Sequence, residues 1–162
     1  MMGQRGATSK LGQLFSRRLS SPGTPEKSCS TLEVVVMFTD VPRTLTALRI
    51  AAQLAHNLNG RIRLVAPQVV PYPLPLESPP VANEFSERRF HTLADHAPVE
   101  TSVELYLCRD RDDALLQALE PESLIVIGAR LSWWPTHERA LARRLRREGH
   151  QVILASPERK ND

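Results

Sequence analysis

Few residues of this chain have the type and the spacing that chemistry requires. Asp40 follows the apolar run 34–39, at the point where a buried strand would leave a sheet. An acid there could bind a ligand or accept a phosphoryl group, since ligands bind at the carboxyl ends of such strands. Phospho-acceptor domains also need a lysine near the last strand, and the segment 151–155 has none. We therefore reject phosphoryl transfer to Asp40.

Sequence motifs for hydrolysis and for metal binding are missing. The chain has no GxSxG elbow, and its five histidines match neither HExxH nor another metal spacing: His56, His91, His96, His137 and His150. Cys108, at the expected end of a strand, would be a nucleophile only if Arg109 or Arg111 lowered its pKa. A packed structural thiol is the commoner case. We expect no catalytic residue, metal ligand or cofactor, and no enzymatic activity.

The composition is that of one globular domain with a basic tail. The chain has 162 residues, 41% hydrophobic and 24% charged, and a net charge of +3. Residues 1–30 hold five basic residues and one acidic residue, which leaves sixteen basic and seventeen acidic residues in the remainder. Because the remainder is near neutral, charge does not indicate nucleic-acid binding. No apolar stretch reaches the ~18 residues of a membrane span. Two distant cysteines favour the cytoplasm.

The ends of the chain are expected to be disordered. Gly, Ser, Arg, Lys and Pro dominate residues 1–30, and we read these residues, like residues 158–162, as solvated tails. A short basic amphipathic helix over 11–19 is the alternative, because such a helix could touch anionic lipid or resemble an organelle presequence. The folded domain then covers residues 31–157.

Strand-like and helix-like patterns alternate through that domain. Strands are expected over 32–40, 61–67, 99–107, 123–128 and 151–155, with helices over about 44–58, 81–97, 109–119 and 136–148. This order predicts a single three-layer α/β/α domain with a five-stranded parallel sheet. The apolar runs 34–39 and 124–127 suit central strands, whereas the alternation over 99–107 favours an edge strand with one solvent-facing side. Six prolines make 67–80 an extended loop.

Three stretches together resemble the universal stress protein (UspA-like) family. They are the first strand with its Ala/Leu-rich helix, 34–55, the strand and helix over 105–118, and the closing unit 123–155. The resemblance implies an adenine nucleotide alpha hydrolase-like fold with strand order 3-2-1-4-5. It also implies a homodimer through the last strand, with Val152, Ile153 and Leu154 at the interface. That strand is short, apolar and without a charge to block pairing.

The nucleotide motif of that family is degenerate in this chain. ATP-binding members carry G-x2-G-x9-G-(S/T) after the fourth strand, because glycines let backbone N–H groups approach phosphates. Gly128 matches the first position, whereas Leu131 stands at the second, and Glu138 and Arg139 fall on the last pair. A carboxylate at that place would repel a triphosphate.

Two function classes follow from this degenerate motif. We predict a domain of the non-ATP-binding type that acts through protein–protein contact in stress response or regulation. The alternative is a nucleotide or small-ligand sensor with Asp40, the loop 67–80, Gly128 and Arg130 around the strand ends.

The loop after the fourth strand holds an unusual aromatic pair, Trp133 and Trp134. We expect one ring to pack on the sheet, and the other to cover the pocket at the strand ends or to project as an interaction anchor. The helix that follows is rich in arginine. A solvated face is the default interpretation, and a surface for an anion or an acidic partner is the alternative.

Overall fold

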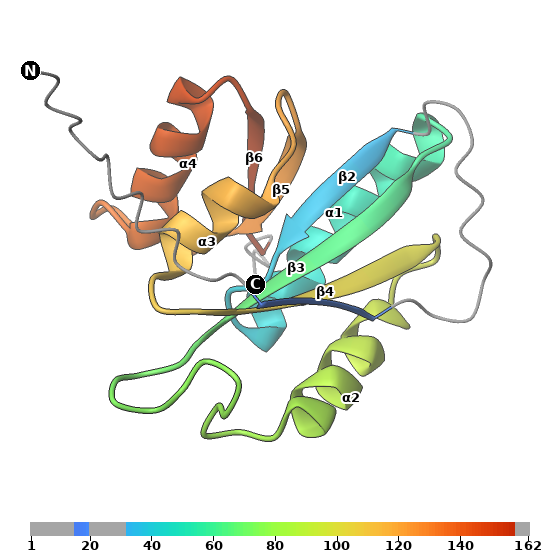
Figure 1. Ribbon diagram of the computed structural model, residues 1–162. Coiled ribbons are helices and arrows are strands. Elements are labelled where there is room, and N and C mark those ends of the chain that lie inside the picture. Colours follow the sequence, from blue (N-terminus) through green and yellow to red (C-terminus); the bar gives the residue numbers. More distant parts are fainter. Residues whose placement is uncertain (1–14, 20–31, 158–162) are drawn as a thin grey trace, which may run out of the picture.

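The computed structural model describes residues 15–19 and 32–157, which form a sheet with helices on both faces (Figure 1). The first strand precedes four strand–helix units and a closing strand. The elements are β1 (Phe15–Leu19), β2 (Glu33–Met37), α1 (Val41–Asn57), β3 (Arg61–Val69), α2 (Asn83–Ala94), β4 (Thr101–Cys108), α3 (Arg111–Ala118), β5 (Leu124–Gly128), α4 (His137–Arg147) and β6 (Gln151–Ala155). No helix within the described ranges is both long and apolar enough to cross a membrane.

The five parallel strands lie in the order β4-β3-β2-β5-β6. Numbered along the chain from β2, this is the predicted order 3-2-1-4-5, which is confirmed together with the four helices. The strand after α1 pairs with one side of β2 and the strand after α3 with the other. The carboxyl ends of β2 and β5 therefore flank the point where the winding of the sheet reverses.

A sixth strand extends the sheet within the segment that composition assigns to a disordered tail. Residues 15–19 form β1, which pairs antiparallel with β4 from Phe15 opposite Leu107 to Leu19 opposite Val103. For these five residues a strand replaces both the expected disorder and the alternative helix over 11–19. β1 forms through a contact between segments far apart in the chain, because without it β4 would present an edge of unpaired backbone groups. The rest of both expected tails lies outside the described residues.

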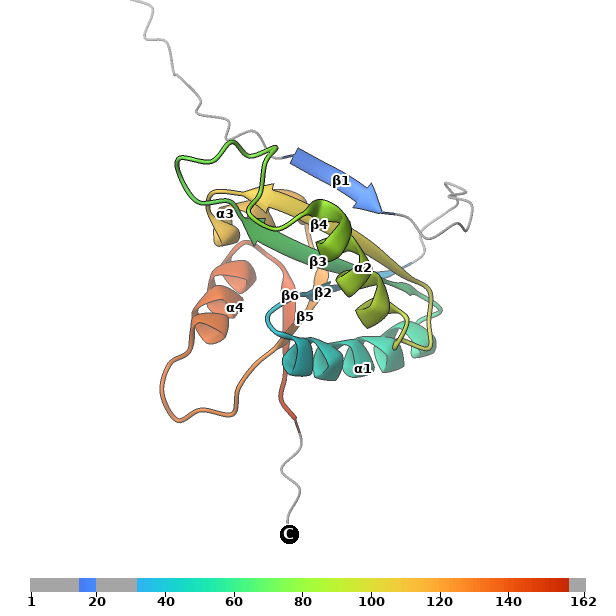
Figure 2. The same ribbon diagram turned by 90° about the horizontal axis from the view of Figure 1, so that it is seen from below.

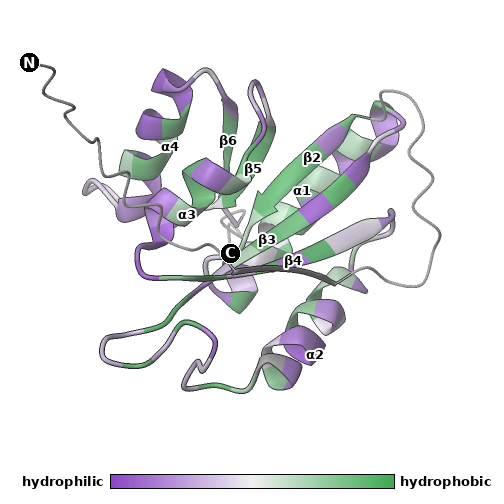
Figure 3. Cartoon of the chain, in the orientation of Figure 1, coloured by the Kyte–Doolittle hydropathy of each residue, from purple (hydrophilic) through white to green (hydrophobic). Residues whose placement is uncertain are grey.

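Two apolar cores cover the two faces of the sheet, and Figure 2 shows from below the helices that lie on either side of it. α1 and α2 pack on one face, where Val34, Val36 and Leu64 are fully buried. α3 and α4 pack on the other, where Val35 and Ile127 are buried. Consecutive residues of β2 thus enter opposite cores, because side chains alternate along a strand. Figure 3 shows the apolar strands between helices with hydrophilic outer faces.

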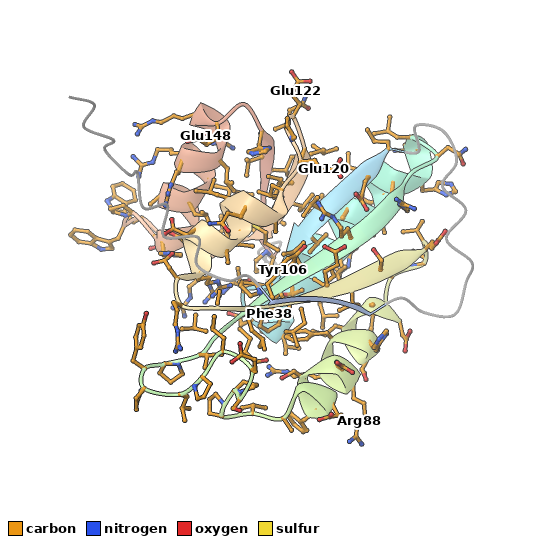
Figure 4. All side chains as sticks on the ribbon, viewed as in Figure 1. Phe38, Arg88, Tyr106, Glu120, Glu122 and Glu148 are labelled. Carbon is orange, nitrogen blue, oxygen red and sulfur yellow. The ribbon has the colours of Figure 1, made fainter. Side chains whose placement is uncertain are left out.

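The polar face of β4 is buried, and the prediction that it faces solvent is wrong. Glu104 and Tyr106 are 3% and 6% exposed, and Figure 4 places Tyr106 in the interior. Arg63 of the neighbouring strand lies 3.1 Å from Glu104 Oε2 and also donates to the carbonyl of Ala118 at 3.2 Å. The Tyr106 hydroxyl donates to the same carboxylate at 2.6 Å. A buried carboxylate is tolerated here because it is paired and hydrogen-bonded.

The proline-rich segment after β3 is held by one arginine. Arg109 donates to the carbonyls of Val70 at 2.7 Å and Leu74 at 2.6 Å, and its guanidinium lies 4.1 Å from the centre of the Tyr72 ring. These contacts fix an extended loop that has no helix or strand of its own. The predicted start of this loop at residue 67 is wrong, because β3 continues through Pro67 to Val69 and pairs there with β4.

Candidate functional site

A small pocket lies at the carboxyl ends of β2 and β5, where α/β sheets bind ligands. It encloses about 150 Å³. Its lining comes from the ends of these strands and from the first turns of α1, α3 and α4: Met37, Thr39, Asp40, Arg43, Arg111, Ile127, His137, Glu138 and Leu141. Charged groups dominate the rim, whereas Met37 and Ile127 form an apolar floor.

The carboxylate of Asp40 has a structural role at the start of α1. It is the N-cap of α1, and its Oδ1 accepts the backbone N–H of Arg43 at 2.9 Å, which satisfies a donor that the helix leaves unpaired. Its other oxygen, Oδ2, lies 2.7 Å from Arg43 Nε. Both carboxylate oxygens therefore have a partner on α1. Pro42 in the first helical turn reinforces this start, since its ring suits that position.

Arg43 links Asp40 to the start of α4. Its Nη1 lies 2.5 Å from Glu138 Oε1, and the two side chains are 26% and 15% exposed. Burial by itself raises the pKa of Glu138. Hydrogen bonds from its own backbone N–H and from the Thr136 side chain, together with the charges of Arg43 and His137, outweigh that effect and hold this pKa below its ordinary value. Glu138 is therefore ionised at neutral pH, and a carboxylate stands at this helix start.

Arg111 closes the third side of the pocket. Its guanidinium donates to the carbonyl of Phe38, at the end of β2. Within the described part of the chain, Arg111 Nε and Asp112 Oδ1 have no hydrogen-bond partner. The other oxygen of Asp112 lies 3.4 Å from His137 Nε2. The pocket thus contains cationic and anionic groups that already face one another.

Gly128 is required by packing of α1 against β5. A Cβ built on this residue would lie 2.3 Å from the carbonyl oxygen of Arg43, which is a backbone atom and cannot move aside cheaply. The Gly128 carbonyl also accepts the hydroxyl of Thr39 at 3.4 Å. The structure therefore supplies a reason for this glycine that does not involve a phosphate.

The predicted ligand-binding residues are only partly brought together. Asp40 lines the pocket and Gly128 lies beside it, whereas Arg130 is exposed and is not among the lining residues. Trp133 and Trp134 are 95% and 76% exposed, so the prediction that one ring packs on the sheet is wrong. The loop carries both rings away from the strands.

Sequence reasoning missed Arg43, Arg111 and His137 as pocket residues. The contact of Arg43 with Asp40 could have been predicted from the sequence, because an N-capping Asp three residues before an arginine places the two side chains on the same helical turn. Arg111 and His137 had none, since their roles depend on how the helices meet.

Metal and thiol chemistry find no support in this geometry. No three His, Cys, Asp or Glu side chains of residues 32–157 are grouped so as to hold a metal ion. Cys108 is buried, and burial, with a further contribution from Asp110, raises its pKa to about 11. This thiol is the packed structural cysteine that we expected.

A wider groove of about 640 Å³ lies away from the strand ends, between α1 and the segment that joins α2 to β4. It is lined by α1 residues and by the segment between α2 and β4: Leu45, Leu48, Arg49, Ala52, Gln53, His56, Asn57, His96 and Pro98. Its apolar lining comes from helix surfaces and not from the switch point of the sheet. The strand-end pocket remains the candidate site.

Comparisons with known proteins agree on the fold. No protein-family model matches this chain, and no curated protein matches its sequence. Among solved structures, a universal stress protein from Archaeoglobus fulgidus has a TM-score of 0.54 at 18% identity, over 76% of this chain and 93% of that one. The universal stress protein from Archaeoglobus fulgidus in complex with dAMP has a TM-score of 0.52 at 19% identity, over 78% and 98% of the two chains. The described domain therefore has the universal stress protein fold, as its UspA-like pattern predicts.

Proposed function

We propose that this protein is a cytoplasmic, non-catalytic domain of the universal stress protein type that does not bind ATP and acts through protein–protein contact in stress response or regulation. The observation that carries this proposal is the chain of ion pairs from Asp40 through Arg43 to Glu138. These groups fill the strand ends with paired charges of the protein itself.

The charges and the size of the pocket both argue against a triphosphate. The start of α4 would offer N–H groups to phosphate, but the ionised carboxylate of Glu138 stands there and repels anions. The pocket of about 150 Å³ is also smaller than the roughly 300–1,000 Å³ that ligand pockets enclose. ATP would have to displace Arg43 from both of its carboxylate partners.

The outer edge of β6 supports self-association. Gln151 and Ala155 bond to the neighbouring β5 segment, through Gln151 N–H to Ser123 O and Ala129 N–H to Ala155 O. Because backbone groups alternate in direction along a strand, the N–H groups of Val152 and Leu154 point outward. No described strand pairs with this edge. Two copies could pair there about a two-fold axis.

Two structural details refine this proposed interface. Arg146 of α4 donates to the Val152 carbonyl at 2.7 Å, so a partner strand would compete with that contact. Ile153 packs against the core on the α1 face, and a lysine there would also disturb the fold. The outward N–H of Leu154 is therefore the better group to test.

Sedimentation velocity at tens of micromolar tests this proposal. Leu154→Pro removes the outward N–H without breaking the ladder to β5. Leu154→Ala is the matched control, because it shortens the same side chain and keeps the N–H. We expect dimers for the wild type and Leu154→Ala and monomers for Leu154→Pro, unchanged by Mg-ATP. A monomeric wild type, or a dimer that requires ATP, would contradict the proposal.

A nucleotide or small-ligand sensor is the second candidate function. It is favoured by the dAMP complex of the Archaeoglobus fulgidus protein, which has the same fold. In this chain the sensor would use Asp40 and Gly128, with the unpaired Nε of Arg111 as a donor to an anion. Such a ligand would have to fit beside the Arg43–Glu138 pair or replace it.

A further inference from the structure

The loop between β5 and α4 exposes three large apolar side chains. Trp133 is 95% exposed, Trp134 76% and Leu131 57%. Figure 2 shows this loop extending away from the sheet, below α4. Isolated exposed apolar residues are ordinary, whereas apolar side chains gathered on one surface are typical of interaction sites, and this loop exposes three within four positions.

A basic helix face adjoins this loop. Arg139, Arg143 and Arg147 recur every four residues along α4, so they lie in one row on the side away from its buried residues Leu141 and Leu145. Figure 3 shows the outer side of α4 as strongly hydrophilic. No described residue forms an ion pair with these three arginines, whereas the neighbouring Arg144 pairs with Asp113 at 3.2 Å. Among residues 32–157 the row is therefore a set of positive charges without an ion-pair partner.

The acidic residues of α4 do not neutralise the row. Glu138 is directed into the strand-end pocket, where it pairs with Arg43. Glu148 is the C-cap of α4, and it forms no ion pair with an arginine of the row (Figure 4). The surface therefore combines exposed indole rings at one end with cations along the helix.

We propose that the loop of Leu131, Trp133 and Trp134 and the row Arg139, Arg143 and Arg147 dock together on an anionic lipid bilayer. Indole rings favour the interface between headgroups and acyl chains, because an apolar body carries a polar N–H. Arginines near an anionic leaflet add electrostatic attraction. Peripheral attachment uses two such elements together.

The geometry favours lipid over a protein or a nucleic acid. A bilayer accepts projecting side chains without a complementary shape, whereas an anchor residue in a protein interface is held by packed neighbours. A ring that is 95% exposed has little such support. Single-stranded nucleic acids bind in basic grooves with aromatic platforms. Neither described pocket includes Trp133 or Trp134.

The chain provides its own probe for this proposal. Its two tryptophans are both in this loop, so tryptophan fluorescence, excited selectively over that of the two tyrosines, reports on the loop alone. With the full chain and vesicles of phosphatidylcholine containing phosphatidylserine, we expect a blue shift, protection from acrylamide quenching and co-sedimentation. With vesicles of pure phosphatidylcholine, the blue shift, the protection from quenching and the co-sedimentation should all be small.

Three double variants separate the possible causes of binding. Trp133→Ala with Trp134→Ala should reduce co-sedimentation at least tenfold. Arg143→Gln with Arg147→Gln should weaken binding about 25-fold, because each arginine near the membrane surface contributes about a factor of five to the affinity. Arg49→Gln with Arg88→Gln removes the same charge from exposed positions on α1 and α2 and should leave binding nearly unchanged. Circular dichroism checks the fold of each variant.

Several results would overturn the proposal. One is the absence of both a fluorescence change and co-sedimentation at about 1 mM lipid in anionic vesicles, a concentration at which even weak binding would be detected. Another is full binding by the double tryptophan variant, which would assign lipid contact to other residues. A fluorescence shift with a single-stranded oligonucleotide but not with vesicles would identify a nucleic-acid surface. Equal losses in the charge control and the α4 variant would show that total charge decides binding.

Discussion

Arg43 Nη1 donates to Glu138 Oε1 over 2.5 Å, although the two residues are 95 positions apart in the chain. This contact joins the first turn of α1 to the first turn of α4 and crosses the carboxyl ends of β2 and β5. It places a fixed internal charge pair where the fold would otherwise receive an anionic ligand. Two of the following predictions, on Glu138→Gln and on nucleotide binding, depend on this Arg43–Glu138 ion pair.

Glu138→Gln should destabilise the protein by about 1 kcal/mol at neutral pH, a modest value because the pair is partly exposed. The pKa of Glu138 is lowered in the folded state, so its contribution is complete above the ordinary Glu pKa. That contribution is lost as the pH falls through the lowered folded value. Urea unfolding at pH 7 and below pH 4 should show the difference shrinking in acid.

Glu120→Gln is the control for this experiment, because Glu120 is exposed and should change stability by less than about 0.5 kcal/mol. Equal effects of the two variants at pH 7, or a Glu138 effect that grows in acid, would refute the role of the ion pair.

Gly128→Ala should destabilise the protein by about 3 kcal/mol, near the upper end for overpacking, because the added Cβ meets the Arg43 backbone. Gly149→Ala is the matched comparison. Gly149 has a φ of +93°, and a Cβ added there would meet no atom within 4 Å. The variant should therefore lose only about 1–2 kcal/mol of folding stability, from backbone strain. Thermal unfolding ranks the two. A harmless Gly128→Ala would show that packing does not require this glycine.

Cys108 should be inert at neutral pH. Its pKa of about 11 leaves a thiolate fraction of about 10⁻⁴ at pH 7. In a Cys29→Ser variant Cys108 is the single thiol of the chain, and its reaction with an aromatic disulfide should accelerate about tenfold per pH unit up to about pH 10. Rapid stoichiometric labelling at pH 7 would contradict the burial of this group.

The parallel sheet could be read from the sequence because its central strands are buried on both faces. Such strands admit only apolar residues, as in Val34–Met37 and Ile125–Ile127, and the helices between them fix parallel pairing. β1 could not be read, because its basic composition is typical of a tail. Its pairing depends on the open edge of β4, which lies some ninety residues away.

Charged residues were the main source of error. Glu104 alternates with apolar neighbours and therefore indicated a solvent-facing strand. It is buried because Arg63 of the next strand neutralises it, a cross-strand relation that one segment alone cannot reveal. The same holds for the candidate site. Asp40 and Gly128 were recognisable, but Arg43 and Glu138 meet only after α1 and α4 have packed.

Equilibrium dialysis with labelled ATP and Mg²⁺ tests the central claim most directly, because the claim is that internal ion pairs take the place of nucleotide at the strand ends. dAMP should be measured in parallel, with the Archaeoglobus fulgidus universal stress protein seen with dAMP as the positive control. We predict no saturable binding of either nucleotide by this chain at about 100 µM. Saturable binding at low micromolar ATP would contradict the account and favour the nucleotide-sensor function.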